Sequence, residues 1–228
     1  MDENTSGAST PAGAPVEVTY YTDPLCPWSW AFEPEWARFL GEAAGRLVVR
    51  YAMGGMLADW RTFRDPVHSI QNPTQMASHW YHVGRVAGVA IDGRLWHDDP
   101  PASSYPACLA VKAAGLQGPA EGASYLRRVR EAAMVGRRNI ARAEVLLAIA
   151  DELDDLGEFD ADRFRDDLIG PGAASAFQED LREIRYREIR RFPTLALRSG
   201  DGPAIAIVGY RPSDELRAIL SRVAEPVA

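Results

Sequence analysis

Cysteine is scarce in this chain of 228 residues, which contains only Cys26 and Cys108. Two cysteines exclude a multi-disulfide scaffold, a zinc ribbon and a four-cysteine iron–sulfur site. The nearby pair His79 and His82 is too small a ligand set, so no metal site is predicted. Hydrophobic residues make up 46% of the chain. A chain of this length and composition can bury a core without disulfides or a structural metal.

An excess of basic charge and long hydrophobic runs are also missing. The formal net charge is -7, which argues against non-specific binding to nucleic acid or to anionic membranes. No apolar run approaches the roughly 18 residues of a membrane span, so we expect no membrane partner. Residues 1–15 have neither the basic nor the apolar segment of a secretory signal. We expect a disordered tail there and a cytoplasmic protein whose thiols stay reduced.

Residues 16–55 have the pattern of a β-α-β unit. Residues 16–22 are β-branched and aromatic, which predicts a strand. An aromatic-rich helix is expected over residues 28–44, with Gly45 as its stop. Residues 46–53 predict a second strand, which a helical crossover makes parallel to the first.

Residues 56–190 are expected to be helical. The spacing of apolar residues predicts helices over 72–88, 103–116, 122–135, 142–153, 160–168 and 173–190. The proline-rich segment 94–105 is predicted to be a loop. This block is interpreted as an all-helical insertion domain.

The remaining residues return to an α/β pattern. Strands are predicted over 194–198 and 204–208, followed by a helix over 212–223. A two-stranded piece is not stable alone, so both ends of the chain should form one sheet. The predicted fold class is therefore α/β. One discontinuous domain of β-α-β and β-β-α units, residues 16–55 and 191–228, is interrupted by the helical insertion.

Cys26 lies in the turn between the first strand and the first helix. Unpaired N–H groups and the helix dipole stabilise a thiolate there, and can lower a cysteine pKa well below the roughly 8.5 of the free side chain. Pro27 suits the first helical position. Ser29 stands where a Cys-x-x-Cys sequence would have its second cysteine. The alternative interpretation of Cys26 is a buried structural cysteine.

A second signal is Phe192-Pro193-Thr194, at the start of a predicted strand. Proline is tolerated at the first residue of a strand, so a simple strand-initiating trans proline explains it when it is taken alone. The combination of this segment with a Cys-Pro-x-Ser turn far upstream is a more specific sequence signal than either motif alone.

Together these residues resemble the DsbA-like thioredoxin-fold proteins that carry a helical insertion. The resemblance spans about residues 16–220. Three runs are similar to a cytoplasmic branch that includes FrnE-type oxidoreductases and SpxH-type adaptors of the Clp protease. They are TDPLCPWSW at 22–30, YAMGG at 51–55 and SSYPAC at 103–108.

The resemblance implies roles for the residues that match the family pattern. Cys26 matches the nucleophilic cysteine, and Pro193 matches a cis-proline whose loop packs beside the active thiol. Ser29 is expected to be a catalytic residue together with Cys26 and Pro193. The residues expected to bind substrate are Pro27, Trp28, Phe192 and Thr194.

The departures from the family pattern leave alternatives open. Ser29 replaces the resolving cysteine, so the site is expected to exchange disulfides as a monothiol. Its hydroxyl is expected to bond either the thiolate or its own backbone. Cys108 is either a second thiol or a small packed residue. Arg190 and Arg191 either add positive potential near Cys26 or lie on a solvated helix end.

The predicted function is thiol–disulfide exchange of the DsbA/FrnE type. The expected substrate is a protein or small-thiol disulfide, with glutathione or another low-molecular-weight thiol as co-substrate and no tightly bound cofactor. One alternative is a non-catalytic SpxH-like adaptor that binds a protein client. Another is a glutathione-dependent isomerase or transferase of the kappa-like class, which has a serine in this turn.

Overall fold

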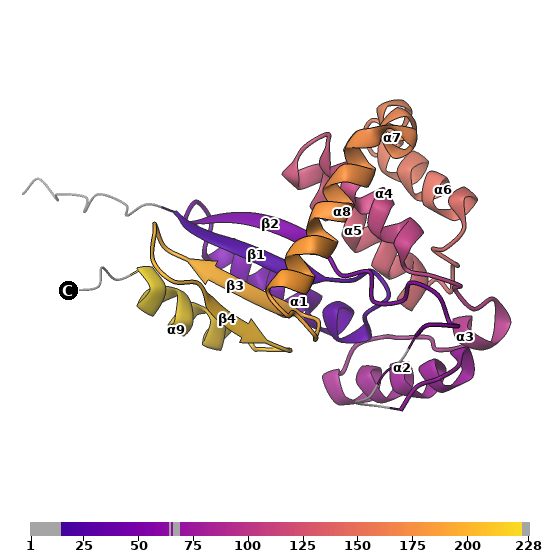
Figure 1. Cartoon of the computed structure of the whole chain (residues 1–228), viewed down its shortest axis with the longest axis horizontal. Coiled ribbons are helices and arrows are strands. Elements are labelled where there is room, and N and C mark those ends of the chain that lie inside the picture. Colours follow the sequence, from indigo (N-terminus) through magenta and orange to yellow (C-terminus); the bar gives the residue numbers. More distant parts are fainter. Residues whose placement is uncertain (1–14, 64, 66–68, 225–228) are drawn as a thin grey trace, which may run out of the picture.

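The computed structural model describes residues 15–63, 65 and 69–224, so almost all of the expected tail at 1–15 lies outside the described residues. Its sheet joins the two ends of the chain in the order β2-β1-β3-β4, which confirms the single predicted sheet (Figure 1). The strands are β1 (Val16–Thr22), β2 (Leu47–Met53), β3 (Thr194–Arg198) and β4 (Ile205–Val208).

The sheet is mixed. Strand β1 is parallel to β2 and antiparallel to β3, and β4 is antiparallel to β3. Helices α1 (Pro27–Glu42) and α9 (Ser213–Ala224) share one hydrophobic core with the sheet. That core is built from aromatic side chains of α1 and alternating strand residues, among them Val16, Val18, Tyr20, Phe32, Trp36, Phe39, Leu195, Leu197, Leu216 and Leu220. These elements form a thioredoxin-like fold.

Helices follow β2 and precede β3. They are α2 (Pro73–Ala87), α3 (Leu95–Asp98), α4 (Tyr105–Gly115), α5 (Pro119–Met134), α6 (Ala143–Asp154), α7 (Ala161–Ile169) and α8 (Pro171–Tyr186). Helix α4 packs against α5, α6, α7 and α8, at the centre of a second hydrophobic core. Within the described ranges, no helix is both long enough and apolar enough to cross a membrane.

Helix α8 attaches the helical block to the sheet (Figure 1). Ile184 packs with Tyr21 on the sheet face opposite α1. The buried carboxylate of Asp180 accepts a hydrogen bond from the backbone N–H of Met53 at 2.8 Å and pairs with Lys112 Nζ at 2.9 Å. These contacts fix the end of β2 against α4 and α8.

Two predictions about the helical block need correction. The segment 94–105 is not wholly a loop, since it contains the single-turn helix α3. The helix expected over 173–190 ends at Tyr186, because Glu188 adopts a positive φ of 53°. The N–H of Glu188 bonds the carbonyl of Arg185, and the N–H of Ile189 bonds that of Ile184. This pattern closes a helix end, usually with glycine at the left-handed position.

Candidate functional site

Cys26 caps the N-terminus of α1, and Pro27 occupies the first helical position. The N–H of Cys26 donates to the carbonyl of Asp23 at 3.1 Å, and its own carbonyl accepts from Trp30 N–H at 3.1 Å. Its Sγ lies 3.5 Å from the carbonyl oxygen of Phe192, and only 4% of the residue is exposed. The thiol therefore lies between the start of α1 and the segment that enters β3.

The segment that enters β3 is held by its own hydrogen bonds. The Phe192–Pro193 peptide bond is cis. Thr194 Oγ1 donates to the carbonyl of Arg191 at 2.7 Å, and Gly209 N–H donates to the carbonyl of Pro193 at 2.8 Å. The Phe192 ring packs on Gly54, where an added Cβ would lie 2.3 Å from the nearest ring carbon. Glycine at position 54 is thus required for this placement of Phe192.

Burial raises the pKa of the Cys26 thiol above its ordinary value. The hydroxyl and the N–H of Ser29 act in the opposite direction, as does the charge of Arg130, whereas the charge of Asp23 raises the pKa further. Desolvation is the largest of these effects, so the pKa of the buried thiol moves in the direction opposite to the lowering that the helix terminus alone predicts. Among the described residues, the buried Ser29 Oγ has no partner at hydrogen-bond geometry, although it lies close enough to Cys26 to stabilise a thiolate there.

The residues expected to bind substrate differ in exposure. Pro27 and Thr194 are buried, whereas Trp28 and Phe192 are partly exposed. The neighbouring Trp30 donates from its ring nitrogen to the carbonyl of Ala90 at 2.9 Å. Trp28 and Phe192 are therefore the members of this set that an incoming molecule can reach.

A wholly buried carboxylate, Asp23, lies in the same turn as Cys26. Its oxygens accept four hydrogen bonds from described residues, which lie in the same turn, after β2, and at or just before the start of α4. The donors are Leu25 N–H at 2.9 Å, Met56 N–H at 2.7 Å, Ser104 Oγ at 2.9 Å and Cys108 Sγ at 3.5 Å. Burial raises the pKa of Asp23 in spite of these donors.

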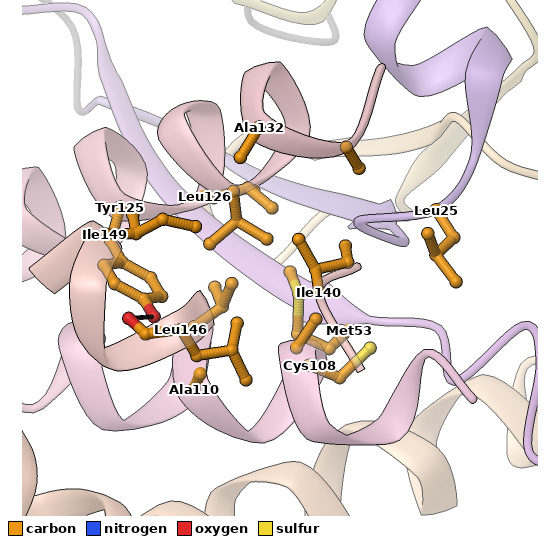
Figure 2. Packing of buried hydrophobic residues seen from close by; sticks show 14 of the residues in the cluster. Leu25, Met53, Cys108, Ala110, Tyr125, Leu126, Ala132, Ile140, Leu146 and Ile149 are labelled. Atoms are coloured by element: carbon orange, nitrogen blue, oxygen red, sulfur yellow. Dashed lines mark hydrogen bonds between the residues drawn. The ribbon is translucent and has the colours of Figure 1, made fainter. Parts of the chain in front are cut away.

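Cys108 lies inside the helical core, where it belongs to the same cluster as Met53 and Ile140 (Figure 2). It is completely buried, and both cysteines are free thiols. Burial, followed by the charge of Asp23, raises the pKa of Cys108 well above its ordinary value. The structure thus brings both cysteines to Asp23, one through its backbone and one through its thiol.

Sequence analysis missed Arg130 of α5, whose side chain is completely buried. The guanidinium bonds Thr22 Oγ1 and the carboxylate of Glu33, and its central carbon is 5.7 Å from the centre of the Tyr20 ring. A sequence signal did exist, because position 130 follows the apolar positions 126 and 129 on one helix face.

The sequence leaves Arg190 and Arg191 either near Cys26 or on a solvated helix end, and the structure exposes both of them. Arg190 forms an ion pair with Glu188 at 3.7 Å. The positive charge that lowers the pKa of Cys26 belongs to Arg130 instead.

A family model described as thioredoxin matches residues 20–217, which is most of the chain. The chain belongs to the DsbA-like thioredoxin-fold family. The cytosolic disulfide reductase DsbM from Pseudomonas aeruginosa is 27% identical, with a TM-score of 0.69 over 90% of this chain and 97% of that one. DsbM has also been solved with GSH. A structure from Nitrosomonas europaea, suggested to be a protein disulfide isomerase, has a TM-score of 0.75 at 23% identity and shows the fold alone.

A curated relative of this DsbA-like protein is named as an adapter protein and not as a disulfide reductase. The ClpXP adapter protein SpxH from Halalkalibacterium halodurans is 31% identical over 200 residues. The match covers 87% of this chain but only 64% of the relative. This DsbA-like protein therefore spans less than two thirds of the length of that relative.

Proposed function

We propose that this protein is a thiol–disulfide exchange enzyme in which Cys26 is the nucleophile and a small external thiol completes the cycle. The observation that carries the proposal is the position of Cys26 Sγ, at the start of α1 and 3.5 Å from the carbonyl oxygen of Phe192. A cysteine so placed is next to both the helix terminus and a strand-entry segment along which a substrate can lie. The 27% identity to the disulfide reductase DsbM over nearly all of both chains supports this proposal.

The exchange takes two steps and needs no second cysteine in the protein. The Cys26 thiolate attacks the glutathione sulfur of a glutathionylated thiol, forms a mixed disulfide with glutathione, and releases the substrate as a thiolate. A second glutathione thiolate then attacks the glutathione sulfur of this mixed disulfide. The products are glutathione disulfide and the regenerated Cys26 thiolate, so sulfur atoms and electrons balance. The structure of DsbM with GSH supports glutathione as the small thiol.

The raised pKa of Cys26 favours reduction of substrates over their oxidation. A disulfide enzyme is a strong oxidant when its reduced form is stabilised, as happens with a low-pKa thiolate. Burial has the opposite effect at Cys26. Such a thiol is a poor leaving group, so transfer of the glutathionyl group from the substrate to Cys26 is favoured over the reverse transfer, and free glutathione is needed to regenerate Cys26. A reducing compartment such as the cytoplasm suits this chemistry, and the identity to the cytosolic disulfide reductase DsbM supports that location.

The surrounding residues have separate roles in this proposal. Ser29 stabilises the Cys26 thiolate with its unpartnered hydroxyl and its N–H. Pro193 and Thr194 hold the strand-entry segment in place. Trp28 and Phe192, which are partly exposed, contact the substrate on either side of the thiol. Pro27 starts the helix and serves the substrate only indirectly.

Turnover of a glutathionylated peptide in the presence of glutathione tests the proposal. The wild-type protein should release the peptide thiol catalytically, and Cys26→Ser should abolish the release. Cys108→Ser is the matched control, and should retain most of the activity because an external thiol resolves the intermediate. Equal rates for the wild type and Cys26→Ser would overturn the proposal.

A second candidate function is that of an adaptor, which the 31% identity to SpxH favours. The protein would then bind a protein client without turnover, and Cys26→Ala would leave binding unchanged. A glutathione-dependent isomerase would instead bind glutathione saturably without exchanging it. The peptide assay separates both alternatives from exchange, since neither releases a peptide thiol.

A further inference from the structure

Arg130 is a charged side chain that the apolar packing of α5 does not require. Its side chain is completely buried, and its carboxylate partner Glu33 keeps 16% of its side-chain surface exposed. No described residue accepts a hydrogen bond from the Nε–H of Arg130. An isolated buried charge is costly unless it is paired and hydrogen-bonded. The incomplete pairing of this guanidinium leaves part of its charge available to another anion.

The guanidinium lies at the base of the turn that carries Cys26. One of its partners, Thr22, is the last residue of β1, and the other, Glu33, is on α1. These two elements flank the turn at residues 23–26. Helix α5 packs against both α1 and β2, so the helical block delivers this charge to the sheet domain.

We propose that Arg130 is a positioning residue that supplies the positive charge for the Cys26 thiolate, and that Glu33 sets how much of this charge reaches the sulfur. The inference rests on the proposed function, because a stabilised thiolate matters only if Cys26 reacts. It assigns an activating role to the helical block, which reaches across to the nucleophile of the sheet domain.

Other groups around Cys26 do not provide this charge. Asp23 from the turn is an acid, Ser29 from α1 is neutral, and the Phe192 segment presents a carbonyl oxygen. Arg190 and Arg191 are exposed beyond that segment. Lys112 and Arg50 pair with Asp180 at the end of β2. Arg130 is the cation whose charge acts on the sulfur, and Glu33 is the carboxylate that acts on Arg130.

The test measures the pH dependence of Cys26 alkylation in a Cys108→Ser background. Arg130→Met should raise the pKa of Cys26, so that alkylation slows several-fold at a fixed pH below the midpoint. Glu33→Gln should lower the pKa, because the carboxylate no longer offsets Arg130. Arg130→Lys keeps the positive charge, so the pKa of Cys26 should stay close to its wild-type value. Opposite shifts at the two positions are a result that loosened packing does not produce.

Arg128→Met is the matched control on the same helix. The side chain of Arg128 is 38% exposed and pairs with Glu131 at 3.0 Å, so its removal should leave the pKa of Cys26 unchanged. If Arg130→Met and Glu33→Gln both leave the pKa unchanged, the guanidinium only joins α5 to α1 and the inference is overturned. Where Arg130→Met does not fold, the sign of the Glu33→Gln shift decides the question.

The alkylation assay contains no disulfide substrate, so it separates the inference from the proposed function. Opposite pKa shifts without peptide turnover would overturn the exchange function and keep the charge assignment. Peptide turnover without these shifts would overturn the role of Arg130 alone.

Discussion

The thiol sulfur of Cys26 lies 3.5 Å from the carbonyl oxygen of Phe192, although 166 positions separate the two residues in sequence. The sheet explains this proximity. Strands β1 and β3 are antiparallel, and Tyr21 near the end of β1 pairs with Thr194 at the start of β3. The residues that follow β1 and those that precede β3 therefore meet at one end of the sheet. The site depends on both ends of the chain being folded together.

Gly54→Ala should impair exchange more than it impairs stability. The new Cβ would lie 2.3 Å from the Phe192 ring, so this ring and the segment next to the thiol must shift. A small displacement of a positioning group is enough to cost about tenfold or more in rate. Peptide turnover and a thermal melt would be measured on the same preparation.

Gly41→Ala is the control for that substitution. Gly41 lies in α1 with nothing within 4 Å of the new Cβ. Alanine there should leave the exchange rate unchanged and stabilise the helix by about 1 kcal/mol. Unchanged turnover in Gly54→Ala would mean that the position of the Phe192 ring does not matter for exchange.

The alkylation rate of Cys26 should still be rising at pH 9. Burial holds the pKa of this thiol above its ordinary value, so only a minority of it is thiolate at neutral pH. The measurement is the rate constant of alkylation against pH in Cys108→Ser protein. A rate that levels off well below pH 9 would show that the helix terminus outweighs the burial, contrary to this account.

Asp23→Asn should destabilise the protein by about 1 to 3 kcal/mol in mildly acidic solution. The asparagine NH₂ group cannot accept the hydrogen bonds of one carboxylate oxygen, so buried donors are left unpaired. Burial raises the pKa of Asp23 above 3.8, so the folded chain holds this proton more tightly than the unfolded chain does. The stability that comes from this tighter proton binding is fully present at pH values below the pKa of Asp23 in the unfolded chain. It is lost as the pH rises through the pKa of Asp23 in the folded chain.

The pH dependence of this effect is the test. The difference in unfolding free energy between the wild type and Asp23→Asn should be largest at low pH and should shrink toward neutral pH. Urea unfolding of both proteins at several pH values measures it. Asp155→Asn, at an exposed position, should show no such trend. A difference that grows with pH would mean that the ionised form of Asp23 is the one that the fold favours.

The fold could be predicted from sequence because local patterns were strong at both ends of the chain. β-Branched and aromatic residues at 16–22 marked the central strand, and Pro27 marked the start of α1. The prediction of one sheet followed from the instability of separate two-stranded pieces. The end of α8 could not be predicted, because it depends on a left-handed backbone conformation at Glu188, and glutamate rarely adopts this conformation.

The site was only partly predictable. The turn at Cys26 and the segment at Phe192 were found because their spacing resembles a known family. The direction of the pKa shift at Cys26 could not be predicted from sequence, because it depends on how deeply the thiol is buried. Arg130 was missed because it lies 104 positions beyond Cys26 on a helix of the insertion, and only the packing of α5 against α1 brings the two together.

The most direct test of the account is mass spectrometry of Cys108→Ser protein after reaction with a glutathionylated peptide. The account predicts that the mass of one glutathione appears on Cys26 and disappears when free glutathione is added, with glutathione disulfide as the product. A protein that never carries this adduct, yet releases the peptide thiol or binds a protein client unchanged, would contradict the claim that Cys26 is the nucleophile.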